Sequence, residues 1–203
     1  MTVNEKIKAL RDRMSRHNID IYIVPTCDFH GSEYVGDYFK CREYISGFTG
    51  SAGTAVIMQD MAGLWTDGRY FIQAADQLEG TGITLFKMGE PEVPTVHEFL
   101  KKNLTQGRCL GFDGRTVSAK EAAELEKMLD ENGVSLSVDH DLAGDIWENR
   151  PVLSCEPVTE LDIKWAGESR ADKCARIRKA MEKKGADLFV LTSLDDIAWL
   201  LNI

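Results

Sequence analysis

The stretch Ser46-Gly47-Phe48-Thr49-Gly50-Ser51-Ala52-Gly53 (SGFTGSAG) carries three glycines at intervals of three, a pattern that also occurs in phosphate-binding loops. Established phosphate loops follow either GxGxxG before a helix or GxxxxGK[ST], and neither pattern is present here. The β-branched apolar run Thr54–Met58 comes directly after the glycines and predicts a strand. A nucleotide-binding function is therefore weakly supported. We expect a tight turn whose glycines permit positive φ and close packing.

Outward from this turn, helical and strand patterns alternate. Apolar residues at helical spacing predict a helix over Val3–Met14 and then a strand at Ile19–Val24. A long polar and aromatic loop with a short helix at Cys41–Ser46 precedes the glycines, and such loops often carry function. These patterns predict an α/β domain with a mixed sheet, helices on both faces and an end near Cys155. The remaining expected elements are a hairpin of Thr54–Gln59 and Leu64–Thr66, a helix over Gly68–Leu78 capped by Asp67, strands at Ile83–Lys87, Cys109–Phe112 and Val134–Val138, and helices opened by the capping boxes Thr95/Glu98 and Ser118/Glu121.

The composition argues against several classes of protein. The 203 residues include 24 basic and 33 acidic side chains, and the basic residues are scattered, so neither nucleic acid nor a membrane surface is an expected partner. Five cysteines without a CxxC pair argue against a disulfide framework and against a thiolate zinc site. No apolar segment approaches the roughly 20 residues of a membrane span. We therefore expect a cytoplasmic protein.

The C-terminal segment repeats part of the N-terminal one. Residues 13–26, RMSRHNIDIYIVPT, align with residues 180–193, AMEKKGADLFVLTS, at a constant offset of 167. A capping box of Ser169 and Asp172 predicts a helix that ends at Gly185, and a strand is expected at Ala186–Thr192. One explanation of this similarity is chance, together with the sequence pattern that all helix–strand units share. The other is that a second copy of the first domain begins here.

Four motifs together resemble a known family. They are Asp28–Tyr34 (DFHGSEY), Arg42–Ala55 (REYISGFTGSAGTA), Leu64–Phe71 (LWTDGRYF) and Leu194–Asn202 (LDDIAWLLN). They resemble the N-terminal region of Xaa-Pro aminopeptidases, and more narrowly the long three-domain form of aminopeptidase P. The resemblance implies a ribonuclease H-like creatinase/prolidase N-terminal domain over 1–156, a truncated start of a second, similar domain over 157–203, and an absent catalytic pita-bread domain.

The same resemblance implies a metal-dependent enzyme that removes the residue preceding proline. Its two divalent metal ions, expected to be manganese, would lie in the missing catalytic domain, so this fragment is expected to be inactive. The expected partners are a peptide with proline at its second position, the protein's own catalytic domain and further copies in a homo-oligomer. We assign no metal ligand or catalytic residue in this chain. Its four histidines are far apart in sequence, and Asp139-His140-Asp141 is interpreted as a solvated turn before a helix near Trp147.

One residue carries over individually. Arg69 matches the family's N-terminal-domain arginine that reaches the substrate peptide, and a guanidinium suits peptide carbonyl or carboxylate oxygens. The alternative is an ion pair with Asp67 or another acid. We interpret Asp67 as a helix cap, His30 as a loop hydrogen-bonding group and Trp65 as a core residue.

A rival interpretation is a stand-alone binding or scaffold module that has the fold without peptidase activity. The fold is shared by several chemistries, so it cannot fix the reaction by itself. The C-terminal residues 169–203 contain many large apolar side chains. We therefore expect this tail to pack on the first domain or to pair with a neighbouring chain.

Overall fold

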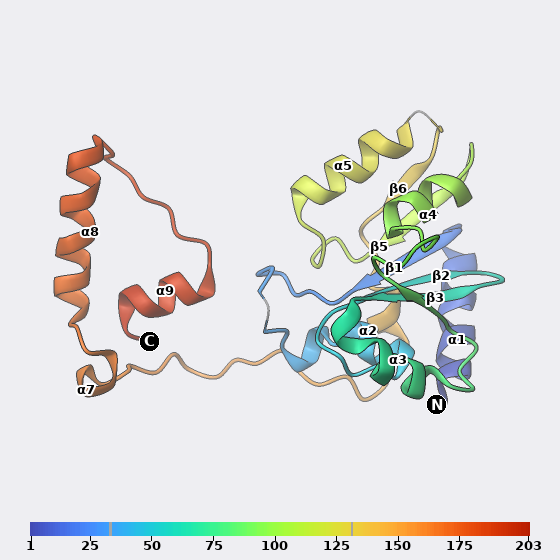
Figure 1. Cartoon of the computed structure of the whole chain (residues 1–203), viewed down its shortest axis with the longest axis horizontal. Helices are drawn as coiled ribbons and strands as arrows, with labels where there is room; N and C mark the ends of the chain where they lie inside the picture. Colours follow the sequence, from blue (N-terminus) through green and yellow to red (C-terminus); the bar gives the residue numbers. More distant parts are fainter. Residues whose placement is uncertain (33, 131) are drawn as a thin grey trace. The chain divides into compact units, whose positions relative to one another are not determined.

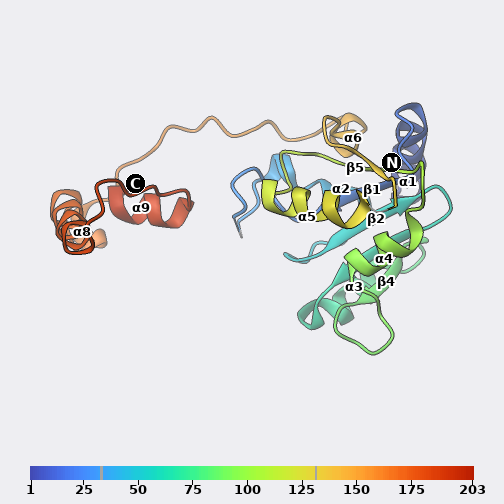
Figure 2. The ribbon, with the colours of Figure 1, turned by 90° about the horizontal axis from the view of Figure 1, so that it is seen from above.

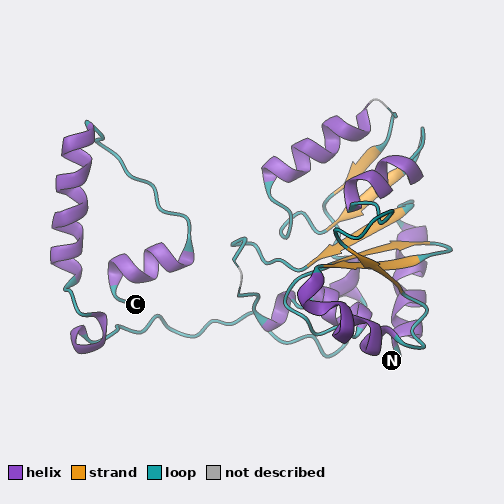
Figure 3. Ribbon diagram, viewed as in Figure 1, coloured by secondary structure: helices purple, strands orange, loops and turns teal. Residues whose placement is uncertain are grey.

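A computed structural model describes residues 1–32, 34–130 and 132–203 of the chain (Figure 1). The chain divides into two compact units, Met1–Leu153 (unit 1) and Ser154–Ile203 (unit 2). Unit 1 contains the β-sheet, and unit 2 consists of helices joined by loops (Figure 3).

The sheet of unit 1 is mixed, as the sequence predicted. Over the described residues its strand order is β4-β3-β2-β1-β5-β6. Strands β1, β2 and β3 pair antiparallel, whereas β4 joins β3, β5 joins β1 and β6 joins β5 in parallel. The hairpin expected after the glycine turn is thus present as β2 and β3. The strands span Ile21–Pro25 (β1), Thr54–Met58 (β2), Ala62–Thr66 (β3), Thr84–Lys87 (β4), Cys109–Phe112 (β5) and Ser135–Ser137 (β6).

Strand β1 lies at the centre because both of its faces are apolar. Tyr22 and Val24 join a core cluster on one face, and Ile21 and Ile23 join a second cluster on the other. Successive side chains of a strand point to opposite faces, so β1 contributes side chains to both core clusters.

Helices cover both faces of the sheet, which confirms the predicted layering. The first cluster receives side chains from α1, α2, α3 and α6, and the second receives them from α4 and α5. Helix α6 comes late in the sequence but packs beside α1 (Figure 2). The helices of unit 1 span Val3–Arg16 (α1), Cys41–Ser46 (α2), Phe71–Leu78 (α3), Val96–Asn103 (α4), Ala119–Asp130 (α5) and Leu142–Asp145 (α6), with 3₁₀ turns at Asp37–Phe39 (η1) and Gly68–Tyr70 (η2).

The predicted helix caps differ in how fully they form. At α4, the Thr95 hydroxyl accepts from the Glu98 N–H and the Glu98 carboxylate accepts from the Thr95 N–H, so this capping box is complete. At α5, Ser118 Oγ accepts from the Glu121 N–H at 3.1 Å. Asp67 caps as expected, but the turn that it caps is the 3₁₀ turn η2, and the α-helix begins afterwards.

Unit 2 consists of α7 (Ile163–Ala166), α8 (Arg170–Lys184) and α9 (Leu194–Leu201). The strand predicted over Ala186–Thr192 is wrong, because these residues form an extended loop between α8 and α9 (Figure 3). A strand needs a partner with which to exchange backbone hydrogen bonds, and residues 154–203, all of which are described, contain no other strand. The predicted end of α8 is confirmed, since Gly185 has φ 63° and closes the helix.

Helices α1 and α8, which belong to the two copies of the repeated sequence, also make similar contacts. Ser169 caps α8 and lies 167 positions after Thr2, which caps α1 in the same way. Lys6 of α1 donates from Nζ to the carbonyl oxygen of Tyr44 in α2, at 2.8 Å. Lys173, also 167 positions later, donates to the carbonyl oxygen of Trp199 in α9, again at 2.8 Å. Helices α2 and α9 both end at a left-handed residue, Gly47 and Asn202 respectively.

Candidate functional site

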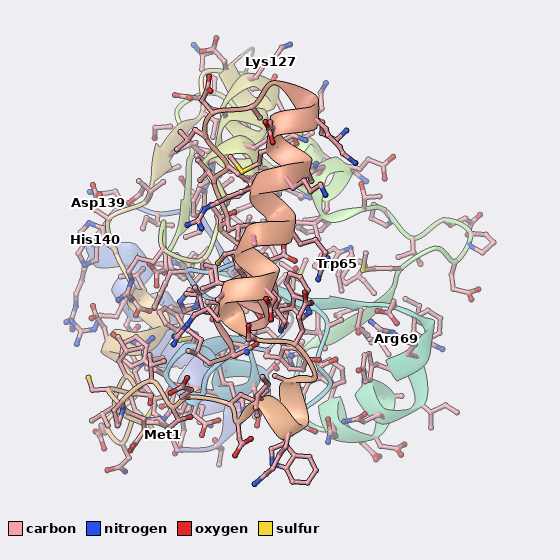
Figure 4. The ribbon with its side chains drawn as sticks, turned by 90° about the vertical axis from the view of Figure 1, so that its left-hand side faces the viewer. Met1, Trp65, Arg69, Lys127, Asp139 and His140 are labelled. Carbon is pink, nitrogen blue, oxygen red and sulfur yellow. The ribbon has the colours of Figure 1, made fainter. Side chains whose placement is uncertain are left out.

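Arg69 lies in the turn between the sheet and helix α3, where strand β3 has just ended (Figure 4). Asp67 accepts from the Arg69 backbone N–H at 3.0 Å, which caps η2. The same carboxylate accepts from Nε and Nη2 of Arg69, at 2.9 Å and 2.8 Å. The ion pair that the sequence left open is therefore present. It holds the planar guanidinium in one orientation by a two-point contact.

The Arg69 side chain remains accessible although it is paired. Its exposed fraction is 64%, and its guanidinium carbon lies 5.2 Å from the centroid of the Tyr70 ring. The Arg69 side chain and then its backbone N–H lower the pKa of Asp67 to about 2, so the carboxylate is ionised at neutral pH. An exposed, oriented cation of this kind can bind a carbonyl or carboxylate oxygen of a peptide. This substrate role remains a prediction.

The glycine stretch packs directly against the Arg69 turn. Ser51 Oγ lies 2.7 Å from Tyr70 Oη, and Thr66 Oγ1 donates to the carbonyl oxygen of Ala52 at 2.7 Å. A Cβ atom on Gly53 would lie 2.9 Å from the carbonyl oxygen of Trp65. The expected close packing beneath the turn is confirmed.

The expectation of positive φ holds for one of the three glycines. Gly47 has φ 74° and ends helix α2, which requires glycine for conformational reasons. Gly50 and Gly53 are outside the left-handed region. A Cβ on Gly50 would overlap the ring of Phe48 and lie 2.8 Å from Tyr70 Cδ1. Glycine is therefore required at these two positions because a Cβ atom has no room there, and not because of the backbone conformation.

Arg42 organises the stretch from within, a role that the sequence reasoning missed. Its side chain is 3% exposed, and its Nη1 and Nη2 donate to the carbonyl oxygens of Phe48 and Gly50. Its Nε donates to Thr26 Oγ1 at 2.9 Å. Burial lowers the pKa of Arg42 to about 10. The available signal was an arginine within a short helix in which Cys41 and Ile45 are also buried.

The interpretations of His30 and Trp65 are confirmed. The His30 N–H donates to Asp28 Oδ1 at 2.9 Å, and His30 Nδ1 lies 3.0 Å from Asp28 Oδ2. Trp65 is fully buried, stacks on Phe86 with 3.9 Å between ring centroids, and donates from Nε1 to the carbonyl oxygen of Pro94. The first residue orders a loop and the second fills the core.

Asp139 and His140 lie on the opposite side of unit 1 from Arg69 (Figure 4). The segment precedes helix α6, as expected, but the interpretation as a solvated turn is wrong, because Asp139 forms a β-bridge with Asp113 and the Asp141 side chain is only 16% exposed. Asp141 caps α6 by accepting from the Gly144 N–H at 2.8 Å. Asp141 Oδ2 also accepts from Arg115 and Arg150, at 2.6 Å and 2.5 Å. The Asp141 carboxylate thus accepts from one backbone N–H and from two arginine side chains, contacts that stabilise the fold.

Within residues 1–32, 34–130 and 132–203, no group of three or more His, Cys, Asp and Glu side chains could hold a metal ion. Among the same residues, none of the helices has the length and apolar character required to cross a membrane.

Known proteins match this chain along its whole length. A family model described as "Creatinase/Prolidase N-terminal domain" matches residues 6–144, and a second model with the same description matches residues 149–203. Two curated relatives, each named "Probable Xaa-Pro aminopeptidase P" and from Laccaria bicolor and Sordaria macrospora, are both 43% identical over 100% of this chain. The chain spans about a third of their length, 32% and 34% respectively.

Solved structures give a consistent result. The chain matches the X-prolyl aminopeptidase from Caenorhabditis elegans, described as a cytosolic enzyme with a di-nuclear active site, with a TM-score of 0.86 and 35% identity. That match covers 100% of this chain and 34% of the other. The N-terminal domain of the peptidase PepQ from Mycobacterium tuberculosis covers 70% of this chain and 98% of its own, with a TM-score of 0.50 and 22% identity. This second likeness concerns the fold alone.

Proposed function

The chain belongs to the creatinase/prolidase N-terminal domain family, and from this premise we propose that it is the non-catalytic N-terminal region of a metal-dependent Xaa-Pro aminopeptidase. The observation that carries the proposal is the 43% identity over the whole chain to relatives named Xaa-Pro aminopeptidase P. The substrate would be a peptide with proline at its second position. The cytosolic description of the Caenorhabditis elegans enzyme supports a cytoplasmic location.

In this proposal the chain contributes to substrate binding and to assembly of the enzyme, and a separate catalytic domain carries out the hydrolysis. Residues 1–156 would form the first domain, and 157–203 would begin a second, similar domain. The shared contacts of Lys6 and Lys173 support this division. Two divalent metal ions, proposed to be manganese, would be held by a catalytic domain outside this chain, and the di-nuclear active site described for the Caenorhabditis elegans enzyme supports their number. A homo-oligomer is part of the same proposal.

Arg69 is proposed to bind the substrate peptide downstream of the scissile bond. Asp67 holds the guanidinium by a two-point contact, while the Arg69 side chain remains 64% exposed. A preorganised cation loses little freedom when it accepts a ligand, which favours peptide oxygens as partners.

The test uses the intact gene product that contains residues 1–203. We expect it to hydrolyse Xaa-Pro peptides, whereas the 203-residue chain alone has no activity. An Arg69→Gln variant should lower kcat/KM by roughly 10-fold to 100-fold, as expected for the loss of a charged hydrogen bond. An Arg16→Gln variant, which alters an exposed arginine at the end of α1, serves as the control.

The possible results separate the alternatives. An intact protein without Xaa-Pro hydrolysis would contradict the proposed function and favour the stand-alone scaffold module. Hydrolysis with equal kcat/KM in the Arg69→Gln and Arg16→Gln variants would support the peptidase function but contradict a role of Arg69 in substrate binding. Robust turnover by the 203-residue chain would contradict the non-catalytic role.

A further inference from the structure

The ring of Tyr70, the residue after Arg69, packs against the glycine stretch (residues 46–53) of unit 1. Phe48 meets it edge-on, with 5.8 Å between the ring centroids and an interplanar angle of 78°. A Cβ atom on Gly50 would lie 2.8 Å from Tyr70 Cδ1, so only glycine allows this approach. Ser51 Oγ lies 2.7 Å from Tyr70 Oη, which is a hydrogen-bond distance. Three residues of one short stretch thus contact a single aromatic ring.

The glycine stretch is itself anchored by a buried side chain. Arg42 is 3% exposed and donates to the carbonyl oxygens of Phe48 and Gly50. Its Nε donates to Thr26 Oγ1, at 2.9 Å, directly after strand β1. Because a buried donor or acceptor that loses its partner destabilises the fold, these contacts restrict the backbone of the stretch. The surface against which Tyr70 packs is therefore fixed relative to the sheet.

The turn that carries Arg69 is joined to the glycine stretch on both sides of that residue. Before Arg69, the buried Thr66 donates from Oγ1 to the carbonyl oxygen of Ala52, at 2.7 Å. After it, Tyr70 is held by Ser51. The Arg69 guanidinium carbon lies 5.2 Å from the centroid of the Tyr70 ring, within the roughly 6 Å over which a cation is attracted to an aromatic ring. The position of the ring therefore influences the position of the cation.

We propose that Ser51 and Tyr70 are positioning residues, whose hydroxyl–hydroxyl bond holds the Tyr70 ring beside the Arg69 guanidinium and so orients Arg69 for the substrate peptide. Asp67 holds the guanidinium through its carboxylate, and the ring adds a second support. Neither hydroxyl group needs to touch the peptide. The orientation of Arg69 is a property of this chain, whereas its effect on a peptide rests on the proposed function.

The first experiment measures the mobility of the Arg69 side chain in the 203-residue chain, by ¹⁵N NMR relaxation of its Nε–H group. Ser51→Ala and Tyr70→Phe each remove one of the two hydroxyl groups. We expect the order parameter of the Nε–H group to fall in both variants. It should fall no further in the double variant, because all three proteins lack the same hydrogen bond. Ser51→Thr keeps a hydroxyl group and should keep the original value.

Tyr44→Phe is the matched control. It removes a tyrosine hydroxyl group that donates to the carbonyl oxygen of Ile146 at 3.0 Å, elsewhere in unit 1. The loss of a hydrogen bond should lower the stability of the chain in both Tyr44→Phe and Tyr70→Phe. Only Tyr70→Phe should change the order parameter of Arg69. The control thus separates a positioning role from a general contribution to stability.

The second experiment measures kcat and KM of the intact gene product with Xaa-Pro peptides. We expect KM to rise roughly threefold to tenfold in Ser51→Ala and in Tyr70→Phe, the factor expected for one neutral hydrogen bond. The value of kcat should change little, because the proposed contact of Arg69 lies away from the scissile bond. Ser51→Thr and Tyr44→Phe should retain the original KM.

Two results would overturn the proposal. The first is an unchanged order parameter of Arg69 in both Ser51→Ala and Tyr70→Phe. The second is an equal KM in Tyr70→Phe and Tyr44→Phe. An intact protein without Xaa-Pro hydrolysis would contradict the proposed function, and the relaxation measurement would still decide whether the two hydroxyl groups position Arg69.

Discussion

Nζ of Lys173 donates to the carbonyl oxygen of Trp199 and also lies over the ring of that residue, 4.7 Å from its centroid. Lys6 makes the same two contacts with Tyr44, where the distance to the ring centroid is 4.1 Å. In unit 2 the ammonium also donates to Asn202 Oδ1 at 2.6 Å. In each unit, one lysine thus donates to a backbone carbonyl oxygen in the later of the two helices, α2 in unit 1 and α9 in unit 2. In unit 2, where no sheet is present among residues 154–203, this contact joins α8 to α9.

Replacing this lysine should release α9. Lys173→Met retains much of the side-chain volume but removes a buried charged donor, at a cost of about 1.5–3 kcal/mol per charged hydrogen bond. We expect faster hydrogen exchange of the backbone amides in 197–202, measured by mass spectrometry or NMR. Lys179→Met changes an exposed residue of the same helix and is the control. Equal exchange in both variants would show that the lysine does not join the helices.

An added methyl group should lower the stability of the chain at Gly50, within the glycine stretch, but not at Gly36, which lies outside it. A Cβ at Gly50 overlaps Phe48, so Gly50→Ala should destabilise the chain by about 1–3 kcal/mol through overpacking. Gly36 has φ −64° and no heavy atom within 4 Å of a built Cβ, so Gly36→Ala should have little effect. Urea unfolding with fluorescence detection measures both changes. A Gly50→Ala variant as stable as Gly36→Ala would refute the packing argument.

The Asp67–Arg69 pair should be visible in a pH titration. The folded-state pKa of Asp67, about 2, lies below its ordinary value of 3.8. The contribution of the pair is therefore present above about pH 4 and is lost as the pH falls towards 2. In Arg69→Gln we expect the carboxyl of Asp67 to titrate closer to 3.8, as followed by ¹³C NMR. The Arg16→Gln variant should retain the low value. An unchanged titration in Arg69→Gln would mean that another group lowers the pKa.

Cys41 should resist alkylation in the folded chain. Burial, followed by the nearby charge of Asp141, raises its pKa from 9.0 to about 12. The thiolate is the reactive species, so its fraction at pH 8 falls by about three orders of magnitude. Cys155 is exposed and should react first with iodoacetamide, as detected by peptide mass spectrometry. All five cysteines should react in denaturant. Similar rates for Cys41 and Cys155 in the native chain would contradict the burial of Cys41.

The apolar side chains of unit 2 should be covered in solution. Leu188 is 80% exposed and Val190 is 68% exposed, and burying each such side chain is worth about 1.5–3 kcal/mol. We therefore expect these side chains to be covered by other apolar surface. Deleting the residues after Pro157 should leave a folded unit 1, and light scattering should show a change in association where pairing is the route. A monomeric full chain whose tail is rapidly cleaved by protease would refute this expectation.

The sequence by itself determined the elements that depend on neighbours in the chain. Helix caps such as Thr95/Glu98 and the hairpin of β2 and β3 were predicted because capping and strand periodicity act over a few residues. The repeat of residues 13–26 was visible for the same reason, since both copies carry the same local pattern. Asp67 was identified as a cap because it stands immediately before the turn that it closes.

Tertiary structure decided the features that depend on residues distant in sequence. Gly53 is required by the carbonyl oxygen of Trp65, and the buried guanidinium of Arg42 is satisfied partly by Thr26, 16 positions away. The run Ala186–Thr192 has the composition of a strand but lacks a partner, so its backbone stays extended without a ladder. A strand exists only when a second strand completes its hydrogen bonds, and a buried charge is stable only where other segments supply its acceptors. No local pattern records either condition.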